Sequence, residues 1–216
     1  MRGLIEKDLR LTLTRKQTIL IFAVMAVFMS MSIEGTFIIG YLTMLAAIIA
    51  VGTISYDEFD NGFAFLMTLP FDRKTYVREK YLFSLMMAAA AWLIGTLLYF
   101  ISSLIRRSPA DPSELPMLLA FIPVLYMSVT VMIPLQLKYG SEKSRVVLFL
   151  IFGIIAVLVF GVSGITGGSS DAFAGPVQTL DRLSPAVVLL FLTAVCVLAS
   201  IASYIASVRI MEKKEF

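Results

Sequence analysis

Long apolar stretches alternate with short polar segments along the whole chain. From Gln17 to Tyr56 the sole charged residue is Glu34, and a straight helix of about 40 residues would be ~60 Å long, roughly twice the thickness of a membrane. This stretch must therefore fold back on itself, and Ser32–Thr36 is its only turn-like place. The pattern predicts six membrane-spanning helices, at residues 17–31, 36–54, 82–105, 115–137, 146–165 and 185–208.

The segment before the first span is polar but patterned. Ile5, Leu9 and Leu13 recur every four residues, and basic residues fill much of the rest. This spacing predicts a helix that lies in the membrane interface ahead of the first span. A basic flank without fixed structure is the alternative.

A second amphipathic pattern lies between the second and third predicted spans. Its apolar residues fall on one helical face, and polar or small residues fall on the opposite face: Phe59, Phe63, Leu66, Met67 and Pro70 against Asp57, Asn61, Ala64 and Thr68. The spacing predicts a short helix from Asp57 to Pro70, which the proline ends. Asp72 then caps a basic helix that leads into the third span.

Composition and charge agree with a membrane protein. Of the 216 residues, 59% are hydrophobic and 15% are charged, whereas soluble domains carry about 25% charged residues. The spans divide the 18 basic residues into fifteen on one side and three on the other, namely Arg106, Arg107 and Arg182. We expect the chain to lie in the cytoplasmic membrane. The positive-inside rule then places both termini in the cytoplasm. We expect one all-α, polytopic membrane domain over residues 1–216.

Several chemistries are disfavoured by the residues present. The chain has no histidine and one cysteine, which removes histidine-type zinc sites and Ser–His or Cys–His catalysis. Gly161–Gly164 reads GVSG, like the nucleophile motif of intramembrane proteases, but no histidine base exists for Ser163. Without a GxxxxGK[ST] loop, the chain has no Walker A nucleotide site.

An ion-coupled transporter remains an alternative. Such carriers place ionisable side chains inside the bilayer, and the six predicted spans contain none. Backbone carbonyls at the Pro123 and Pro134 kinks could still bind sodium. A membrane immunity or scaffold protein is a further alternative. Arg106 and Arg107 are read as solvated charges or as contacts for an anionic group, and the segment 166–184 as an outer loop that caps the bundle or dips into the bilayer.

The polar segment after the second span resembles a known family. Glu58, Gly62, the run LMTLP at Leu66–Pro70, and then Arg73, Tyr76 and Lys80 look like the cytoplasmic segment of ABC-2 type permeases, the membrane subunits of ATP-binding-cassette (ABC) exporters. The layout of an interfacial helix followed by six spans is similar too. The chain departs from the family pattern at Phe63, where a small hydroxyl residue is usual.

This resemblance implies a mechanism and partners. The short helix would be the coupling helix that docks into a groove of a separate cytoplasmic ATPase, which binds the ATP and Mg²⁺; no cofactor is expected in this chain, and no catalytic, metal or nucleic-acid site. A second permease protomer, identical or not, would complete the transporter. Its substrate would be amphipathic or hydrophobic, a peptide or a lipid-like molecule, and a weaker likeness to phenol-soluble-modulin and antimicrobial-peptide exporters favours a peptide. The expected ATPase contacts are Asp57, Glu58, Phe59, Asn61, Gly62, Phe63, Leu66 and Leu69.

Overall fold

The computed structural model describes residues 1–32, 36–59, 62–106, 115–165 and 184–214. Within these ranges the chain is built from helices and contains no β-strand. The helices are α1 (Arg2–Thr14), α2 (Lys16–Ser32), α3 (Phe37–Glu58), α4 (Gly62–Met67), α5 (Arg73–Arg106), α6 (Leu115–Ile165) and α8 (Pro185–Lys213). The prediction of an all-α fold is confirmed for these residues.

Four described helices are long and apolar enough to cross a membrane. They are α3, α5, the Leu118–Ser144 part of α6, and α8; the pair α1 and α2, bent by 71°, would be a fifth. The fold-back predicted within residues 17–56 is confirmed, because α2 ends at Ser32 and α3 begins at Phe37. The chain is therefore a multi-pass membrane protein. Six spans remain a prediction.

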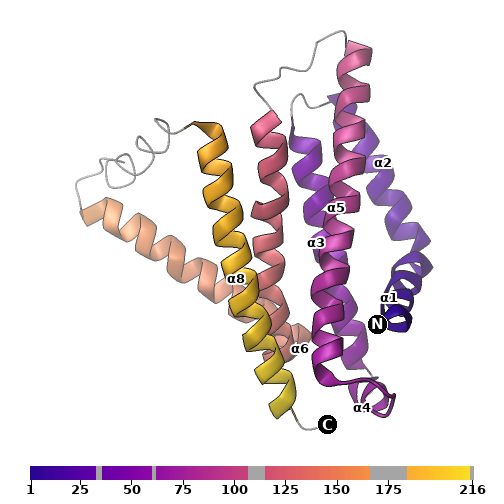
Figure 1. Ribbon diagram of the computed structural model, residues 1–216. Helices are drawn as coiled ribbons and strands as arrows, with labels where there is room; N and C mark the ends of the chain where they lie inside the picture. Colours follow the sequence, from indigo (N-terminus) through magenta and orange to yellow (C-terminus); the bar gives the residue numbers. More distant parts are fainter. Residues whose placement is uncertain (33–35, 60–61, 107–114, 166–183, 215–216) are drawn as a thin grey trace.

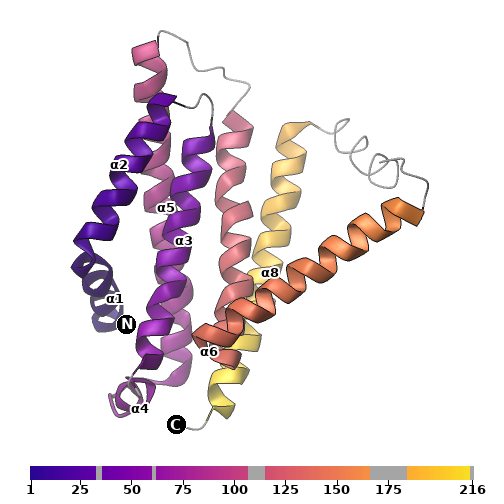
Figure 2. The same ribbon diagram turned by 180° about the vertical axis from the view of Figure 1, so that it is seen from behind.

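The predicted fourth and fifth spans lie in two helical segments of α6, which meet at a kink. Within α6, Gly140 has φ 78° and ψ 173°, a left-handed conformation that favours glycine. The bend lies between the two predicted ranges, and Figure 2 shows the part of α6 after it leaning away from the other helices. The expected loop between these spans is thus a bend centred on a single residue.

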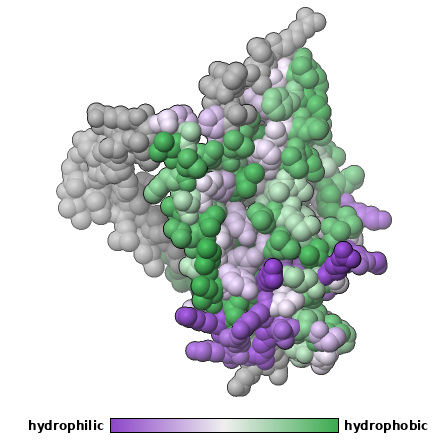
Figure 3. Space-filling view, in the orientation of Figure 1, coloured by the Kyte–Doolittle hydropathy of each residue, from purple (hydrophilic) through white to green (hydrophobic). Residues whose placement is uncertain are grey.

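The bundle is arranged around α3. This helix packs against both α5 and α6, and α8 packs against α6 (Figure 1). Polar side chains gather at the end of the molecule that carries α4 and the C-terminus, whereas most of the visible face above them is apolar (Figure 3). We call this end the polar end. The larger buried cluster lies here and includes Ile54, Phe63, Tyr76, Ile133 and Met211.

The N-terminal helix is present, and its orientation is informative. The buried face of α1 carries Leu4, Asp8 and Thr12. Leu9 and Leu13 from the predicted apolar stripe are 45% and 53% exposed, so they point away from the bundle. An outward apolar face is what an interfacial helix needs to rest in a membrane surface.

Candidate coupling surface

The predicted helix from Asp57 to Pro70 does not form as one element. Asp57 and Glu58 are the last residues of α3, Phe59 is extended with ψ 143°, and α4 covers only Gly62–Met67. A Cβ on Gly62 would lie 2.7 Å from the carbonyl oxygen of Asp57, which no side chain tolerates. Gly62 therefore permits the tight return of the chain against the end of α3, and the prediction of a continuous helix was wrong. Asn61 lies outside the described residues.

The inner face of α4 is covered by the chain itself. Phe63 and Leu66 are 5% and 7% exposed. The ring of Phe63 meets the ring of Tyr76 edge-on, with centroids 5.8 Å apart, and the ammonium of Lys214 lies 4.6 Å from its centroid. These residues anchor α4 to α5 and α8, so in this structure they are not accessible to another protein.

The outer face of α4 and its flanks presents a different set of apolar residues. Phe59 is 66% exposed, Phe65 is 69% exposed and Leu69 is 40% exposed. We call these three residues the α4 patch. Phe65 is not among the contacts expected from the sequence, whereas Phe59 and Leu69 are. The patch stands at the polar end, where an exposed phenylalanine ring has no membrane core to contact if that end faces water.

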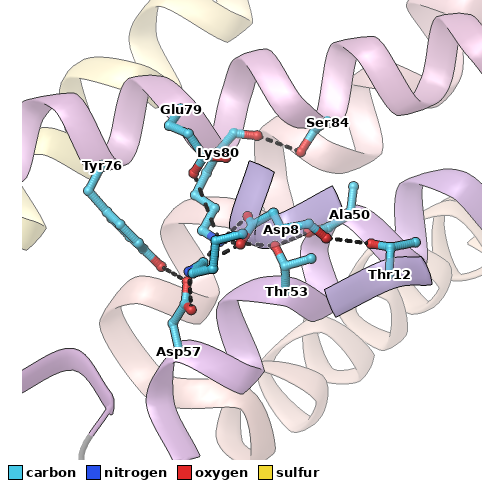
Figure 4. A network of polar contacts seen from close by, with 10 residues as sticks. Asp8, Thr12, Ala50, Thr53, Asp57, Tyr76, Glu79, Lys80 and Ser84 are labelled. Atoms are coloured by element: carbon cyan, nitrogen blue, oxygen red, sulfur yellow. Dashed lines mark hydrogen bonds and ion pairs between the residues drawn. The ribbon is translucent and has the colours of Figure 1, made fainter. Parts of the chain in front are cut away.

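Behind the patch, Asp57 is held in a buried polar network (Figure 4). Its Oδ2 accepts a hydrogen bond of 2.9 Å from the Tyr76 hydroxyl and lies 2.7 Å from the ammonium of Lys80. Its Oδ1 accepts a hydrogen bond from the ammonium of Lys7. With 5% of its surface exposed, Asp57 braces α3 against α1 and α5, and its carboxylate oxygens are engaged by its own chain.

Lys80 and Asp8 form the centre of this network. Both are almost fully buried, and the Lys80 ammonium pairs with Oδ2 of Asp8 while donating a hydrogen bond of 3.0 Å to Thr53. Glu79, also fully buried, has a carboxylate oxygen 4.0 Å from the same ammonium. Buried ions are costly to desolvate, but losing one partner of such a set leaves an uncompensated charge. The network therefore fixes the mutual placement of α1, α3 and α5.

Lys7 closes the network from the interfacial helix. Its ammonium lies 3.1 Å from Oδ1 of Asp8 and also pairs with Asp57. Burial disfavours the charged ammonium, but the attraction of the Asp57 and Asp8 carboxylates outweighs it and raises the pKa of Lys7 above its usual value. Lys7 thus stays protonated and keeps α1 attached to the end of α3.

Glu58 joins the end of α3 to the bend in α6. Its Oε2 accepts a hydrogen bond of 2.8 Å from the backbone N–H of Ser141. A Cβ on Gly140 would lie 2.4 Å from the other carboxylate oxygen. A shallow groove beside this contact is lined by Phe59, Tyr139, Glu142 and Lys143 as well as the contact residues. Glu58 therefore contacts its own chain, and its expected role at an ATPase remains a prediction.

Arg73, the first residue of α5, closes the end of α8. Its Nη1 donates hydrogen bonds to the carbonyl oxygens of Met211, Glu212 and Lys214, at 3.0, 2.7 and 3.0 Å. A cation at this position satisfies helix-terminal carbonyls and opposes the negative end of the helix dipole. Lys214 in turn donates to the carbonyl of Leu137 in α6, at 3.2 Å. Hydrogen bonds next to α4 thus join the start of α5, the end of α8 and α6.

Sequence reasoning missed this network because its members are far apart in the chain. Asp8 and Lys80 are 72 residues apart, and nothing local pairs them. Leu4, Asp8 and Thr12 share the buried face of α1, but an acid opposite an apolar stripe is usually solvated, so the spacing gave no signal of its partner. The family-like residues Tyr76 and Lys80 prove to be structural contacts of Asp57.

Comparison with known proteins agrees with this arrangement. The family model described as "ABC-2 family transporter protein" matches residues 3–212, nearly the whole chain. No curated protein sequence is similar enough to the chain to count as a relative. The match spans α1 through α8, so it includes the α4 patch and the buried network behind it.

Proposed function

Because the chain belongs to the ABC-2 family of transporter proteins, we propose that it is the membrane permease subunit of an ABC exporter. It moves an amphipathic or hydrophobic substrate outward, and a separate ATPase subunit hydrolyses the ATP. A peptide is the substrate class that the sequence favours. The chain itself contributes no Walker A loop, so ATP and Mg²⁺ belong to the partner subunit.

The α4 patch is the observation that carries this proposal. Phe59, Phe65 and Leu69 are exposed on α4 or close to its ends, and α4 lies at the polar end (Figure 1). A helix that presents apolar anchors to a groove is a common mode of recognition between proteins, and aromatic side chains dominate the energy of such contacts. An ATPase groove with an apolar floor is the partner that we assign to the patch.

The basic residues support the orientation that docking requires. Fifteen of the 18 basic residues lie in segments at the side of the predicted spans that carries both termini and α4. The positive-inside rule makes this the cytoplasmic side of the cytoplasmic membrane. A cytoplasmic ATPase would therefore reach the α4 patch directly.

Motion of the patch would pass into the spans through buried contacts. Phe63 anchors α4 on Tyr76 of α5, and Tyr76 hydrogen-bonds Asp57 at the end of α3. A displacement of α4 would thus move α3 and α5 together. We propose that two such permeases enclose the substrate path between them, since the bundle described here is small.

The test is capture of the ATPase through a tag on the permease. The permease is co-expressed with a candidate ABC ATPase from a neighbouring reading frame, and Phe65→Asp is compared with Phe65→Leu. Placing an unpaired carboxylate in an apolar groove costs several kcal/mol, and each ~1.4 kcal/mol is a factor of ten in affinity. We expect Phe65→Asp to lose the ATPase and substrate-stimulated hydrolysis, while Phe65→Leu keeps both.

The exposed position makes this variant informative. Phe65 is 69% exposed, so aspartate there leaves the packing of the permease intact, whereas a charge at buried Phe63 would also damage the fold. Retention of ATPase and of stimulated hydrolysis by Phe59→Asp and Phe65→Asp would show that the patch is not the docking surface. ATP hydrolysis by the purified chain alone would contradict the proposal that a separate subunit hydrolyses the ATP.

A further inference from the structure

A groove lies where the interfacial helix turns into the bundle. The axes of α1 and α2 meet at 71°, and α3 packs against both helices. We call the junction of α1 and α2 at Arg15 the elbow. The groove between them has a cavity volume of about 240 Å³, below the roughly 300–1,000 Å³ of pockets for whole small molecules. Its size suits a slender group such as an alkyl chain rather than a bulky ligand.

The two ends of the groove differ in chemistry. Ile19 and Phe22 from α2 and Ile48 and Ile49 from α3 line one end, whereas Arg15 at the elbow lines the other. At 1.5 Å per residue, the step from Arg15 to Phe22 covers about 10 Å along the helix. A ligand in the groove therefore meets a cation at its head and hydrocarbon along its length.

Arg15 is positioned to bind an anion. Its guanidinium carbon lies 4.3 Å from the centroid of the Tyr56 ring, so a cation–π contact holds the guanidinium beside the ring. The side chain is exposed, and no carboxylate among the described residues forms an ion pair with it. A guanidinium held in this way offers its N–H groups in the paired geometry that phosphate oxygens accept.

The surroundings point to lipid as the source of that anion. The flank of α2 beside the groove is apolar and exposed, as Leu20, Ile21 and Val24 are 66%, 59% and 61% exposed, which places the groove against acyl chains. Residues 1–16 carry five basic and two acidic side chains, so the elbow attracts an anionic membrane surface.

We propose that the elbow groove binds one anionic phospholipid, with its phosphate on Arg15 and one acyl chain between α2 and α3. The bound lipid fills the space that the bend leaves and attaches the elbow to the membrane surface. This proposal rests on the membrane location of the chain alone. It does not require ATP, an ATPase or the direction of transport.

Gly52 provides a way to close the groove without disturbing its walls. It lines the groove from α3, and a Cβ added there would meet nothing within 4 Å. Leucine at this position projects into the cavity rather than into packed atoms. Gly52→Leu therefore removes the acyl-chain site, while Arg15→Gln removes only the charge at its mouth.

The experiment is native mass spectrometry of the purified permease with phosphatidylglycerol and phosphatidylcholine supplied at equal concentration in detergent. We expect the wild-type chain to retain phosphatidylglycerol in preference. Arg15→Gln lowers that preference about fivefold, which corresponds to ~1 kcal/mol for one interfacial basic residue. Gly52→Leu loses bound lipid of both kinds.

The matched control is Arg10→Gln. Arg10 lies on the same helix and pairs with Glu6 at 2.6 Å on the exposed side, outside the groove lining, so its loss changes the net charge equally. We expect it to retain the wild-type preference. The Arg15 variant alters an exposed side chain, and its comparison with Arg10→Gln decides the question even if Gly52→Leu fails to fold.

Four results would overturn the proposal. Equal losses in Arg15→Gln and Arg10→Gln would indicate diffuse attraction to anionic lipid, and an unchanged preference in Arg15→Gln would remove the headgroup site. A shift from dimer to monomer in Gly52→Leu with unchanged lipid retention would show that a second protomer occupies the groove. A bound peptide mass in place of lipid on the wild-type chain would assign the groove to a substrate.

Discussion

Glu58 and Ser141 connect the end of α3 to the bend in α6, through a hydrogen bond of 2.8 Å from the Ser141 N–H to the carboxylate. The bend is possible because Gly140 adopts φ 78°, and the same glycine lets the carboxylate approach the backbone. The positive φ of Gly140 and the hydrogen bond between Ser141 and Glu58 therefore depend on each other. The end of α3 thus contacts α6 directly after its bend.

Gly140→Ala should destabilise the protein. A side chain at positive φ costs about 1–3 kcal/mol, and its Cβ would also lie 2.4 Å from Oε1 of Glu58. Thermal unfolding of the purified protein measures the loss. Gly52→Ala is the control, since that helical glycine has open space and alanine there should stabilise by up to ~1 kcal/mol. Equal effects of the two variants would mean that the corner imposes no special conformation.

A double-mutant cycle separates the two causes. In a Glu58→Ala background the steric conflict is absent, so Gly140→Ala should retain only the conformational cost. The interaction energy between the two positions is then the difference between the two losses. Additive effects would show that Glu58 and Gly140 act independently.

Lys80→Met should be far more destabilising than Lys74→Met. Lys80 is 1% exposed and pairs with Asp8 and Asp57, so its loss leaves buried carboxylates uncompensated at a cost of about 3–5 kcal/mol. Lys74 pairs with Glu212 at 3.3 Å on the surface, where a pair contributes about 0–1 kcal/mol. Unfolding in detergent, followed by tryptophan fluorescence, compares the two. Similar stabilities would show that the network is not what fixes α1 against α3 and α5.

Cysteine labelling in intact cells tests the orientation of the bundle. In a Cys196→Ala background, Ser184→Cys at the start of α8 should react with a membrane-impermeant maleimide, because it lies at the opposite end from the basic segments. Lys143→Cys, exposed next to the α6 bend, should react only after permeabilisation. Labelling of Lys143→Cys in intact cells and of Ser184→Cys only after permeabilisation would reverse the topology and exclude a cytoplasmic ATPase at α4.

The hydrophobic pattern predicted where helices form, but it predicted wrongly which side chains around α4 are buried and which are exposed. The apolar stretches became α2, α3, α5, α6 and α8, because length and hydropathy are properties of each segment alone. The four-residue spacing that joined Phe59 and Phe63 did not show that α3 ends at Glu58 and that α4 begins at Gly62. As a result Phe63 is buried and Phe59 is exposed. Covering a helix face requires partners from distant segments, and the spacing within one helix carries no record of them.

The same limit applies to charge. Counting basic residues treats Lys7 and Lys80 as two more cations at the polar end, whereas in the structure both are ion-paired inside it. The pairing between α1 and α5 has no local signature. In contrast, Gly62 and Glu58 were singled out by their resemblance to a family motif, and the structure gives them backbone roles at the end of α3.

The cap that Arg73 forms on α8 has a consequence for biosynthesis. Its three acceptor carbonyls belong to Met211, Glu212 and Lys214, which the ribosome makes after α4 and α5. Until α8 inserts, the guanidinium lacks these acceptors and Phe63 lacks the cover of Lys214. The contacts around α4 are therefore completed late, and a nascent chain exposes them incompletely to chaperones and proteases until α8 is in place.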